Sequence, residues 1–458
     1  MTLKIKFQQL TTYIEALLPH EIHLLVNLAD KKDKLNYALI KKIEGYVLKK
    51  QPLNFDTAID KRRYANLKKW MQQRLLEYNV DYKYEYLLHI EELIYTDSIS
   101  VDEERWIFTA ISHNKYNTFN FIKWYETIEK FMQYLLIRLR YDDYNKVEHF
   151  IRTHQKRYNK CVSTRNKISA ASIDIVHHYM GKLKNSNQWE DFLIDVMYDV
   201  EVEGYLRYMA LVRLTFMYSN YNNFKNLLEH YTYFDKLFST QQLFFSKRFL
   251  LNFYANRSLI LIRNKAYKQA EYYARLSVKI PLNDHLLYLN NLSSILLKQH
   301  RITEALQLMN GALPIMHKTH NFHNKFSFIS FFVKCLIAEK EYKKAAQFAE
   351  SILAVYGKEI IRYRWHLFFT VYVESLFMQQ KWQQVLTVIK KYKLLILDKQ
   401  QKMRAGYLPW IPIYYLTAAY MEGNLSKEKF TAEYHTWRKV YKKQNKLHAL
   451  FDQVDELI

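Results

Sequence analysis

The chain has 458 residues, of which 49% are hydrophobic, and its 68 Lys and Arg against 45 Asp and Glu give a net charge of +23. It contains only 7 glycines and 6 prolines, which argues against β-sandwiches and barrels because those folds need many tight turns. Long helices joined by short turns suit this composition, and few of these turns are expected to depend on positive φ.

Residues 1–110 are predicted to form a helical N-terminal region without repeats. In "KRRYANLKKWMQQRLLEY" (61–78), apolar residues such as Tyr64 and Leu67 fall on one stripe of a helix. Asp60 stands where an N-cap residue belongs. Residues 111–250 are predicted to form irregular helix pairs, because "YDDYNKVEHFI" and "NSNQWEDFLIDVM" each place an aromatic residue between a polar turn and a helix-like segment.

Residues 251–400 carry an internal repeat. In each copy a bulky residue is followed three residues later by a small or branched one, and these later residues are 35, 40 and 40 positions apart, at 270, 305, 345 and 385. Another amphipathic stretch precedes every copy, so the predicted unit is a helix, a short turn and a second helix. The copies are "NKAYKQAEYYARLSV" (264–278), "QHRITEALQLMNGAL" (299–313), "EKEYKKAAQFAESIL" (339–353) and "QQKWQQVLTVIKKYK" (379–393).

This pattern resembles the tetratricopeptide repeat (TPR). Small residues where two antiparallel helices meet let the backbones approach closely, and aromatic residues fill the wider gaps. The resemblance implies an all-α fold, an α-solenoid of antiparallel helix pairs in a right-handed superhelix. The family's first-helix glycine is absent, and Val333 and Glu374 stand where small residues are expected. The residues that carry the resemblance are Ser258 and Ser293 in the first helices, Tyr267, Ala270, Ala274, Ser277 and Pro281 in the best copy, and Ala305, Ala312 and Pro314 in the next.

Residues 401–458 are predicted to be capping helices, with Gly423 and Asn424 at the turn of one more pair. No transmembrane segment is expected, because the most apolar runs, at 326–338 and 365–377, are too short to span a bilayer. The two cysteines match no disulfide framework or metal spacing, which indicates a reducing, cytoplasmic location.

No catalytic motif is apparent, and the chain is therefore predicted not to be an enzyme and to have no cofactor or metal. The isolated glycines build no P-loop and no GxGxxG, and "HEIH" (20–23) lacks the spacing of a zinc-binding helix. Cys161 lies among basic residues, but it lacks a base partner and is interpreted as an inert thiol. The acidic segment "DVEVEG" (199–204) is interpreted as a solvated face that pairs with the surplus of Lys and Arg.

Two basic ridges are candidate polyanion-binding surfaces. Arg62 and Lys69 lie two helical turns apart, opposite the apolar stripe of residues 61–78. Arg152, Lys156 and Lys160 follow one another at four-residue spacing, which forms one ridge on a helix. Basic helix faces are also expected throughout a protein with this net charge, so the ridges alone do not establish nucleic-acid binding.

The favoured function is a non-enzymatic scaffold or adaptor that binds a protein or peptide partner. The TPR resemblance implies a concave groove lined by the first helices of the pairs. Two alternatives stay open: a basic helical-repeat protein that binds RNA or DNA through phosphate contacts, and a peptide-sensing regulator. The groove residues implied by the resemblance are Asn256, Arg263, Asn290, Ser294, Lys298, Lys334 and Gln379.

Overall fold

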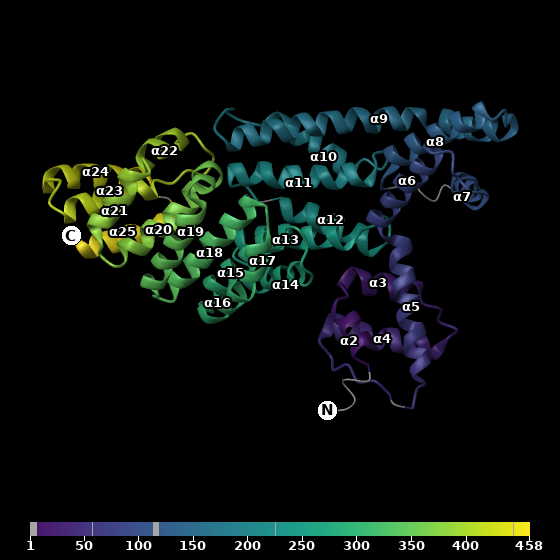
Figure 1. Cartoon of the computed structure of the whole chain (residues 1–458), viewed down its shortest axis with the longest axis horizontal. Helices are drawn as coiled ribbons and strands as arrows, with labels where there is room; N and C mark the ends of the chain where they lie inside the picture. Colours follow the sequence, from purple (N-terminus) through teal and green to yellow (C-terminus); the bar gives the residue numbers. More distant parts are fainter. Residues whose placement is uncertain (1–6, 57, 113–118, 225, 443) are drawn as a thin grey trace. The chain divides into compact units, whose positions relative to one another are not determined.

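The computed structural model of the chain describes residues 7–56, 58–112, 119–224, 226–442 and 444–458. Within these ranges the protein is all-helical, with 78% helix, 24 α-helices and no strand (Figure 1). The predicted all-α fold is confirmed. The described chain forms two compact units: the first comprises Met1–Ile175, Ser186–Ser219 and Asn223–Asn256, and the second Val176–Asn185, Asn220–Asn222 and Arg257–Ile458.

The helices up to the end of the first unit include one that is far longer than the others. They are α2 (Gln8–Glu15), α3 (Pro19–Leu28), α4 (Lys34–Lys49), α5 (Lys61–Tyr78), α6 (Val80–Tyr95), α7 (Val101–Ser112), α8 (Phe121–Ile137), α9 (Tyr141–Tyr179), the 3-10 turn η1 (Asn187–Trp189), α10 (Glu190–Tyr198), α11 (Gly204–Tyr221), α12 (Leu227–Ser239) and α13 (Lys247–Arg263).

Helices α2 to α5 enclose the first apolar core of the chain. Tyr64, Leu67 and Met71 of α5 are buried in it, as the stripe predicted. The side chain of Asp60 accepts a hydrogen bond from the amide of Arg62 at 2.9 Å, so the predicted N-cap is also confirmed. The sequence of residues 61–78 therefore determines both where this helix begins and which side it buries.

Helix α9 runs unbroken for 39 residues (Figure 1). It begins two residues after Leu139 and ends two residues before Gly181, and both of these have positive φ. Helix α9 therefore serves as the second helix of one pair and also as the first helix of the next pair, and no loop divides it. Irregular helix pairs were predicted for residues 111–250, and the continuous apolar spacing from Val147 to Ile175 explains why a single long helix stands here.

The second unit contains the C-terminal end of α13 with its partner α14, and then four further helix pairs. The remaining helices are α14 (Tyr267–Ser277), α15 (His285–Lys298), α16 (Ile302–Gly311), α17 (Leu313–Lys318), α18 (Phe322–Ala338), α19 (Tyr342–Tyr363), α20 (Trp365–Phe377), α21 (Trp382–Lys391), α22 (Leu394–Gln401), α23 (Trp410–Met421), α24 (Lys427–Val440) and α25 (Asn445–Leu457).

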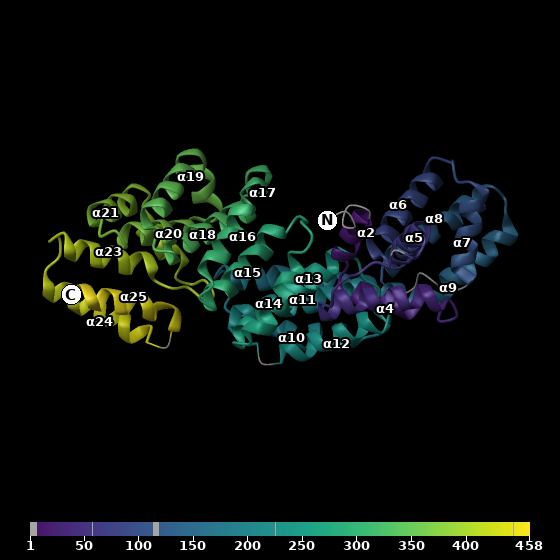
Figure 2. The same cartoon turned by 90° about the horizontal axis from the view of Figure 1, so that it is seen from below.

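The pairs pack in a regular order, and Figure 2 shows α15 to α24 following one another. The first helices α15, α18, α20 and α23 pack in sequence, with contacts between α15 and α18, between α18 and α20, and between α20 and α23. Each of them also contacts the second helix before it and the second helix after it, as α18 contacts α16 and α19. The four predicted second helices begin at the bulky residue of each repeat, from Tyr267 to Trp382.

Nine helices of the described chain end in the same backbone turn. In each, one residue has φ between 52° and 72°, and the next amide donates to the carbonyl five residues earlier, as Arg301 does to Leu296 at 2.9 Å. This is the Schellman motif. Successive turns are 35 (265 to 300) to 43 (380 to 423) residues apart. The residues with positive φ are Asp97, Leu139, Gly181, Asn222, Lys265, His300, Lys340, Gln380 and Gly423.

The prediction that few turns depend on positive φ is wrong, because seven of these nine residues are not glycine. The left-handed conformation costs an L-residue about 1–2 kcal/mol. The turn offsets this cost by satisfying two carbonyls at the end of the helix. Scarce glycine therefore did not exclude this kind of turn.

The helix pairs align better when residue positions are counted from the positive-φ residue of each turn than when they are counted from the small residues of the repeat. The fifth residue after the turn is fully buried in six cases, whether it is alanine, valine, leucine or serine. The seventh residue before the turn is Val333 in one pair and Val373 in the next, both fully buried. Glu374 therefore does not replace the small residue of the first helix, since it lies one position further along. The six buried residues after the turns are Ser186, Leu227, Ala270, Ala305, Ala345 and Val385.

The C-terminal segment contains the predicted pair, α23 and α24, with its turn at Gly423 and Asn424. A further helix, α25, buries Leu450 and Phe451. Tyr434 of α24 donates to the carboxylate of Asp455 at 2.8 Å and ties α25 to this pair. In the described part of the chain, no helix combines the length and the apolar character that crossing a bilayer requires.

Candidate binding surface

Polar side chains repeat at one position on three successive first helices. Ser294 of α15, Lys334 of α18 and Glu374 of α20 each lie six residues before the residue with positive φ. Lys298 lies one helical turn further along α15 and is exposed, as is Lys334. Because these helices pack side by side, the four residues belong to one surface, which we call the A-helix strip.

Opposite charges face each other in the A-helix strip. Burial raises the pKa of Glu374, and the nearby ammonium group of Lys334 opposes this rise. The side chain of Glu374 also adds to the rise in the pKa of the buried Tyr414 on α23. Ser294, Lys334 and Glu374 thus place a hydroxyl, an ammonium and a carboxyl group on successive first helices, which suits a polar peptide more than an apolar one. Glu374 is not among the predicted groove residues, and its position relative to the turn identifies it.

Three of the predicted groove residues are either buried or hydrogen-bonded within the protein. Asn256 of the first unit donates to Asn252 at 3.1 Å and hydrogen bonds to Tyr231. Gln379 donates to the carbonyls of Tyr342 at 3.1 Å and of Ser375 at 2.8 Å. Asn290 is 4% exposed. None of these three side chains is presented as a groove residue would be.

Arg263 is exposed at the end of α13. Lys298 lies over the ring of Tyr267, 5.8 Å from its centroid, and keeps its ammonium group accessible. The predicted groove residues that the structure brings together on one exposed surface are therefore Ser294, Lys298 and Lys334.

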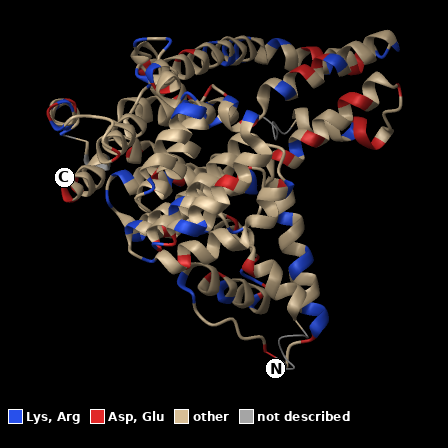
Figure 3. Ribbon diagram, turned by 60° about the vertical axis from the view of Figure 1, so that its left-hand side comes forward, with Lys and Arg blue, Asp and Glu red and all other residues tan. Residues whose placement is uncertain are grey.

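The polyanion ridges are exposed, but part of their charge is neutralised. Arg152 pairs with Glu148 at 2.9 Å, and Lys160 pairs with Asp199 at 2.6 Å. The second pair is the kind of contact predicted for the acidic segment 199–204. Arg62, Lys69 and Lys156 have no ion pair among the described residues. Lys and Arg are spread over helices of both units, with acidic residues between them (Figure 3).

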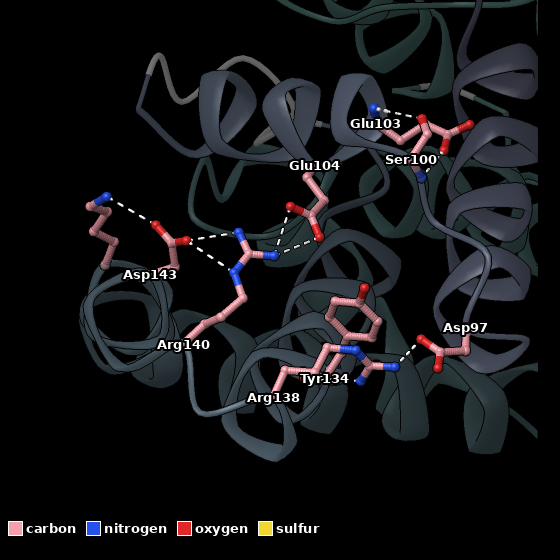
Figure 4. Close-up of polar contacts among 9 residues, drawn as sticks. Asp97, Ser100, Glu103, Glu104, Tyr134, Arg138, Arg140 and Asp143 are labelled. Carbon is pink, nitrogen blue, oxygen red and sulfur yellow. Dashed lines mark hydrogen bonds and ion pairs between the residues drawn. The ribbon is translucent and has the colours of Figure 1, made fainter.

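An arginine follows the turn between α8 and α9 and binds two carboxylates (Figure 4). The Nη1 atom of Arg140 lies 2.7 and 2.8 Å from the two carboxylate oxygens of Glu104 on α7. Its Nη2 atom lies 2.8 Å from Asp143 on α9. The hydrogen bond from Arg140, assisted by Lys146, holds the pKa of Asp143 below its usual range. We call this arrangement the Arg140 clamp.

The second unit contains the same arrangement. Arg301 follows the turn between α15 and α16, and its Nη1 atom lies 2.9 and 2.8 Å from the carboxylate oxygens of Glu271 on α14. Its Nε atom donates to Glu304 on α16 at 2.8 Å, and Arg275 bridges both carboxylates. We call this the Arg301 clamp. Both clamps join consecutive second helices, and all their charged groups are mutually satisfied, so their role is structural.

Two further contacts fix the helix ends near the Arg140 clamp (Figure 4). Ser100 and Glu103 form a capping box, in which the amide of Ser100 donates to Glu103 at 2.7 Å. The guanidinium of Arg138 lies 3.7 Å from the ring centroid of Tyr134 and pairs with Asp97. Asp97 is itself the residue with positive φ at the end of α6. These contacts hold the turns in place and leave no group free for chemistry.

The arrangement most similar to a catalytic one is a buried histidine in the first unit. His20 lies 2.6 Å from the hydroxyl of Tyr254 through Nδ1, and 3.2 Å from Asp235 through Nε2. The Tyr254 side chain is fully buried and aromatic rings enclose the imidazole, so no substrate reaches it. The contacts join α3 to α12 and α13. His20 is thus a core histidine that is 5% exposed and joins three helices.

Cys161 and Glu203 lie close together in the core of the first unit. Burial raises the pKa of the Cys161 thiol to about 11, which agrees with its interpretation as an inert thiol. Burial also raises the pKa of Glu203 to about 7. The Glu203 carboxylate accepts a hydrogen bond from the amide of Ile122 at 2.8 Å and so caps the start of α8.

Comparisons with known proteins identify no relative. No protein-family model matches the chain, no curated protein matches it, and no solved structure matches its fold. The functional argument therefore depends on the residues of this chain alone.

Proposed function

We propose that the chain is a TPR-like helical-repeat scaffold whose second unit binds a protein or peptide partner along the A-helix strip. The observation that carries this proposal is the repetition of a polar residue at one position of α15, α18 and α20. A polar side chain at the same place in consecutive repeats creates a continuous row of anchors, which is how a repeat array binds an extended segment.

The packing order of the helices supports a solenoid arrangement of the second unit. Each first helix contacts the first helix of the next pair, and each second helix contacts the first helix that follows it. Such nearest-neighbour packing is typical of repeat arrays. Right-handed superhelical winding is part of the proposal.

The charges of the A-helix strip define the partner that suits it. Lys298 and Lys334 are exposed ammonium groups, and Glu374 lies beside Lys334. An extended peptide that carries carboxylates, with a basic residue opposite Glu374, would pair with all three. Nucleic acid is less well suited, because Glu374 would repel its phosphates and several cations of the ridges are already neutralised.

The proposal is tested by selecting ligands from a random peptide library with the purified chain, then measuring their affinity by fluorescence anisotropy. We expect the double change Lys298→Ala and Lys334→Ala to weaken a selected peptide at least tenfold. Lys343→Ala is the matched control, because Lys343 is exposed on the second helix α19, outside the strip, and should leave the affinity within twofold.

A selected peptide that binds equally well to the double variant would refute the assignment of the strip. Single-stranded RNA, titrated in the same assay from low to high salt, addresses the alternative. RNA binding that is lost with Arg62→Ala and Lys69→Ala, and unchanged with Lys298→Ala and Lys334→Ala, would favour nucleic acid instead.

A further inference from the structure

A group of cations surrounds the start of α20 in the second unit. Arg364 is the N-cap residue of α20, and its side chain accepts no capping hydrogen bond from the first amides of this helix. Arg404, in the segment between α22 and α23, places Nη1 3.5 Å from Nδ1 of His366, which lies in the first turn of α20. The first turn carries no acidic residue. Positive side chains therefore add to the positive end of the helix dipole.

No carboxylate balances this charge. Within the described residues, neither Arg364 nor Arg404 forms an ion pair with Asp or Glu. The other contacts of Arg404 are the side-chain oxygen of Gln401 at 2.7 Å and the ring of Tyr179, whose centroid lies 4.6 Å away. The Nε atom of Arg364 is buried and has no hydrogen-bond partner. A buried donor of this kind carries a desolvation penalty unless an acceptor binds it.

A third cation lies close by at the start of α18, which packs beside α20. Lys325 is 5% exposed, and its ammonium group is 3.4 Å from the hydroxyl of Tyr356 and 4.8 Å from the centroid of that ring. The neighbouring Phe322 ring lies 5.7 Å from that of Tyr363, which directly precedes Arg364. Lys325 also forms no ion pair with a carboxylate among the described residues.

The histidines report the electrostatic potential of this region. Burial, Arg404 and Arg364 together lower the pKa of His366 to about 3. Burial and Arg364 also lower the pKa of His323. Because the Arg404 guanidinium is only a donor, Nδ1 of the neutral His366 accepts and Nε2 carries the proton. His366 is therefore a neutral hydrogen-bond donor between two guanidinium groups.

We propose that Arg364, Arg404 and His366, together with the first amides of α20, form a binding site for a phosphate monoester. Two guanidinium groups match the charge of a dianion, and each presents a planar set of donors that suits phosphate oxygens. The amides at a helix start are donors of the same kind. The site lies apart from the A-helix strip residues and does not depend on the proposed peptide binding.

The test is equilibrium dialysis of the full chain against radiolabelled inorganic phosphate, with ionic strength held constant by NaCl. We expect one saturable site per chain. Arg364→Gln and Arg404→Gln should each weaken phosphate binding at least tenfold. The matched control is Arg362→Gln, because Arg362 is exposed two residues away, and it should change the affinity less than twofold.

Both glutamine variants should unfold at a midpoint equal to or above that of the wild type, because each removes an unbalanced charge. A second arm compares a phosphoserine peptide with its unphosphorylated form. If the phosphopeptide binds more tightly than free phosphate, the ligand of the site is a phosphate group on a macromolecule. If the two bind equally, the ligand is a small phosphate ester. The absence of saturable binding of either probe, or an equal loss in Arg362→Gln, would overturn the site.

Discussion

The first and second units use the same helix-ending turn, and in both units the buried residue that follows it varies in size. Five residues after the turn, the first unit buries Ser186 and Leu227, whereas the second unit buries Val385 and three alanines, Ala270, Ala305 and Ala345. Each unit also contains an arginine clamp, in which one guanidinium binds a glutamate through both carboxylate oxygens. The difference shows that the backbone turn, rather than the alanine pattern, marks the repeat. The size of the buried residue adapts each pair to the space available.

The largest expected effect comes from exchanging these sizes. Leu227→Ala should leave a cavity and lower the stability of the first unit by about 2–5 kcal/mol. Ala305→Leu should overpack the second unit and lower its stability by about 1–3 kcal/mol. Urea unfolding followed by hydrogen exchange assigns each loss to its unit. Ala432→Leu on the exposed side of α24 is the control and should change stability by less than about 0.5 kcal/mol. Equal losses in all three variants would contradict the comparison.

A pH effect on stability is expected in the first unit, from the buried carboxyl group of Glu203. The pKa of Glu203 is raised to about 7 in the folded chain, so between its ordinary pKa and this value the folded state holds more protons than the unfolded state. Stability from this group is therefore present at low pH and falls as the pH rises, by roughly 2–3 kcal/mol from pH 5 to pH 8. Ionised Glu203 faces Glu126, Arg157 and Arg165, of which the arginines moderate the effect.

Glu203→Gln is the variant that tests this effect. Glutamine keeps an acceptor for the amide of Ile122 but cannot ionise. Unfolding free energies measured at pH 5 and pH 8 should show a smaller difference for the variant than for the wild type. If the difference between the unfolding free energies at pH 5 and pH 8 is the same for the variant and the wild type, Glu203 does not ionise in this range.

Two glycines with the same φ of 72° should respond differently to alanine. A Cβ atom at Gly423 would meet no other atom within 4 Å, so Gly423→Ala should cost only the strain of the left-handed conformation, about 1–2 kcal/mol. A Cβ atom at Gly181 would lie 2.6 Å from the carbonyl oxygen of Met403. Gly181→Ala should therefore cause the larger loss of stability in the second unit, as measured by urea unfolding. Equal losses would show that the close approach is absent.

The smallest effect is expected at the arginine clamps. Lysine keeps the charge but cannot bind a carboxylate with two parallel hydrogen bonds. Arg140→Lys should lower the stability of the first unit by about 1 kcal/mol or less, because the clamp is partly exposed. Arg301→Lys should lower the unfolding midpoint of the second unit. The two changes should act additively, since the clamps share no residue. A non-additive result in a double-variant cycle would contradict their independence.

Composition and residue spacing were sufficient to predict the all-α fold, the start of α5 at Asp60 and the four second helices from Tyr267 to Trp382. The nine turns could not be predicted from glycine, because residues such as Leu139 and His300 adopt positive φ under the control of the backbone hydrogen bonds. The length of α9 depends on an apolar spacing that continues from Val147 to Ile175, which the prediction of irregular helix pairs did not include.

The candidate site was predicted only in part. Lys298, Lys334 and Ser294 were predicted because the TPR resemblance places them on first helices, and the structure brings these three together on one surface. Asn256 and Gln379 have the same polar character, but tertiary contacts with Tyr231 and Tyr342 occupy them. Glu374 was misread as a departure from the repeat, since the correct alignment depends on the turn. The cations Arg364 and Arg404 are far apart in sequence, and only the fold brings both of them near His366.

The central claim is that the chain binds a partner along the first helices of its second unit. The most direct measurement is hydrogen exchange of the full chain with and without a peptide selected from the library. We predict slower exchange in α15, α18 and α20 on binding, with no change in the second helices α14, α16 and α21. Protection confined to those second helices, or to α5 and α9, would contradict the claim.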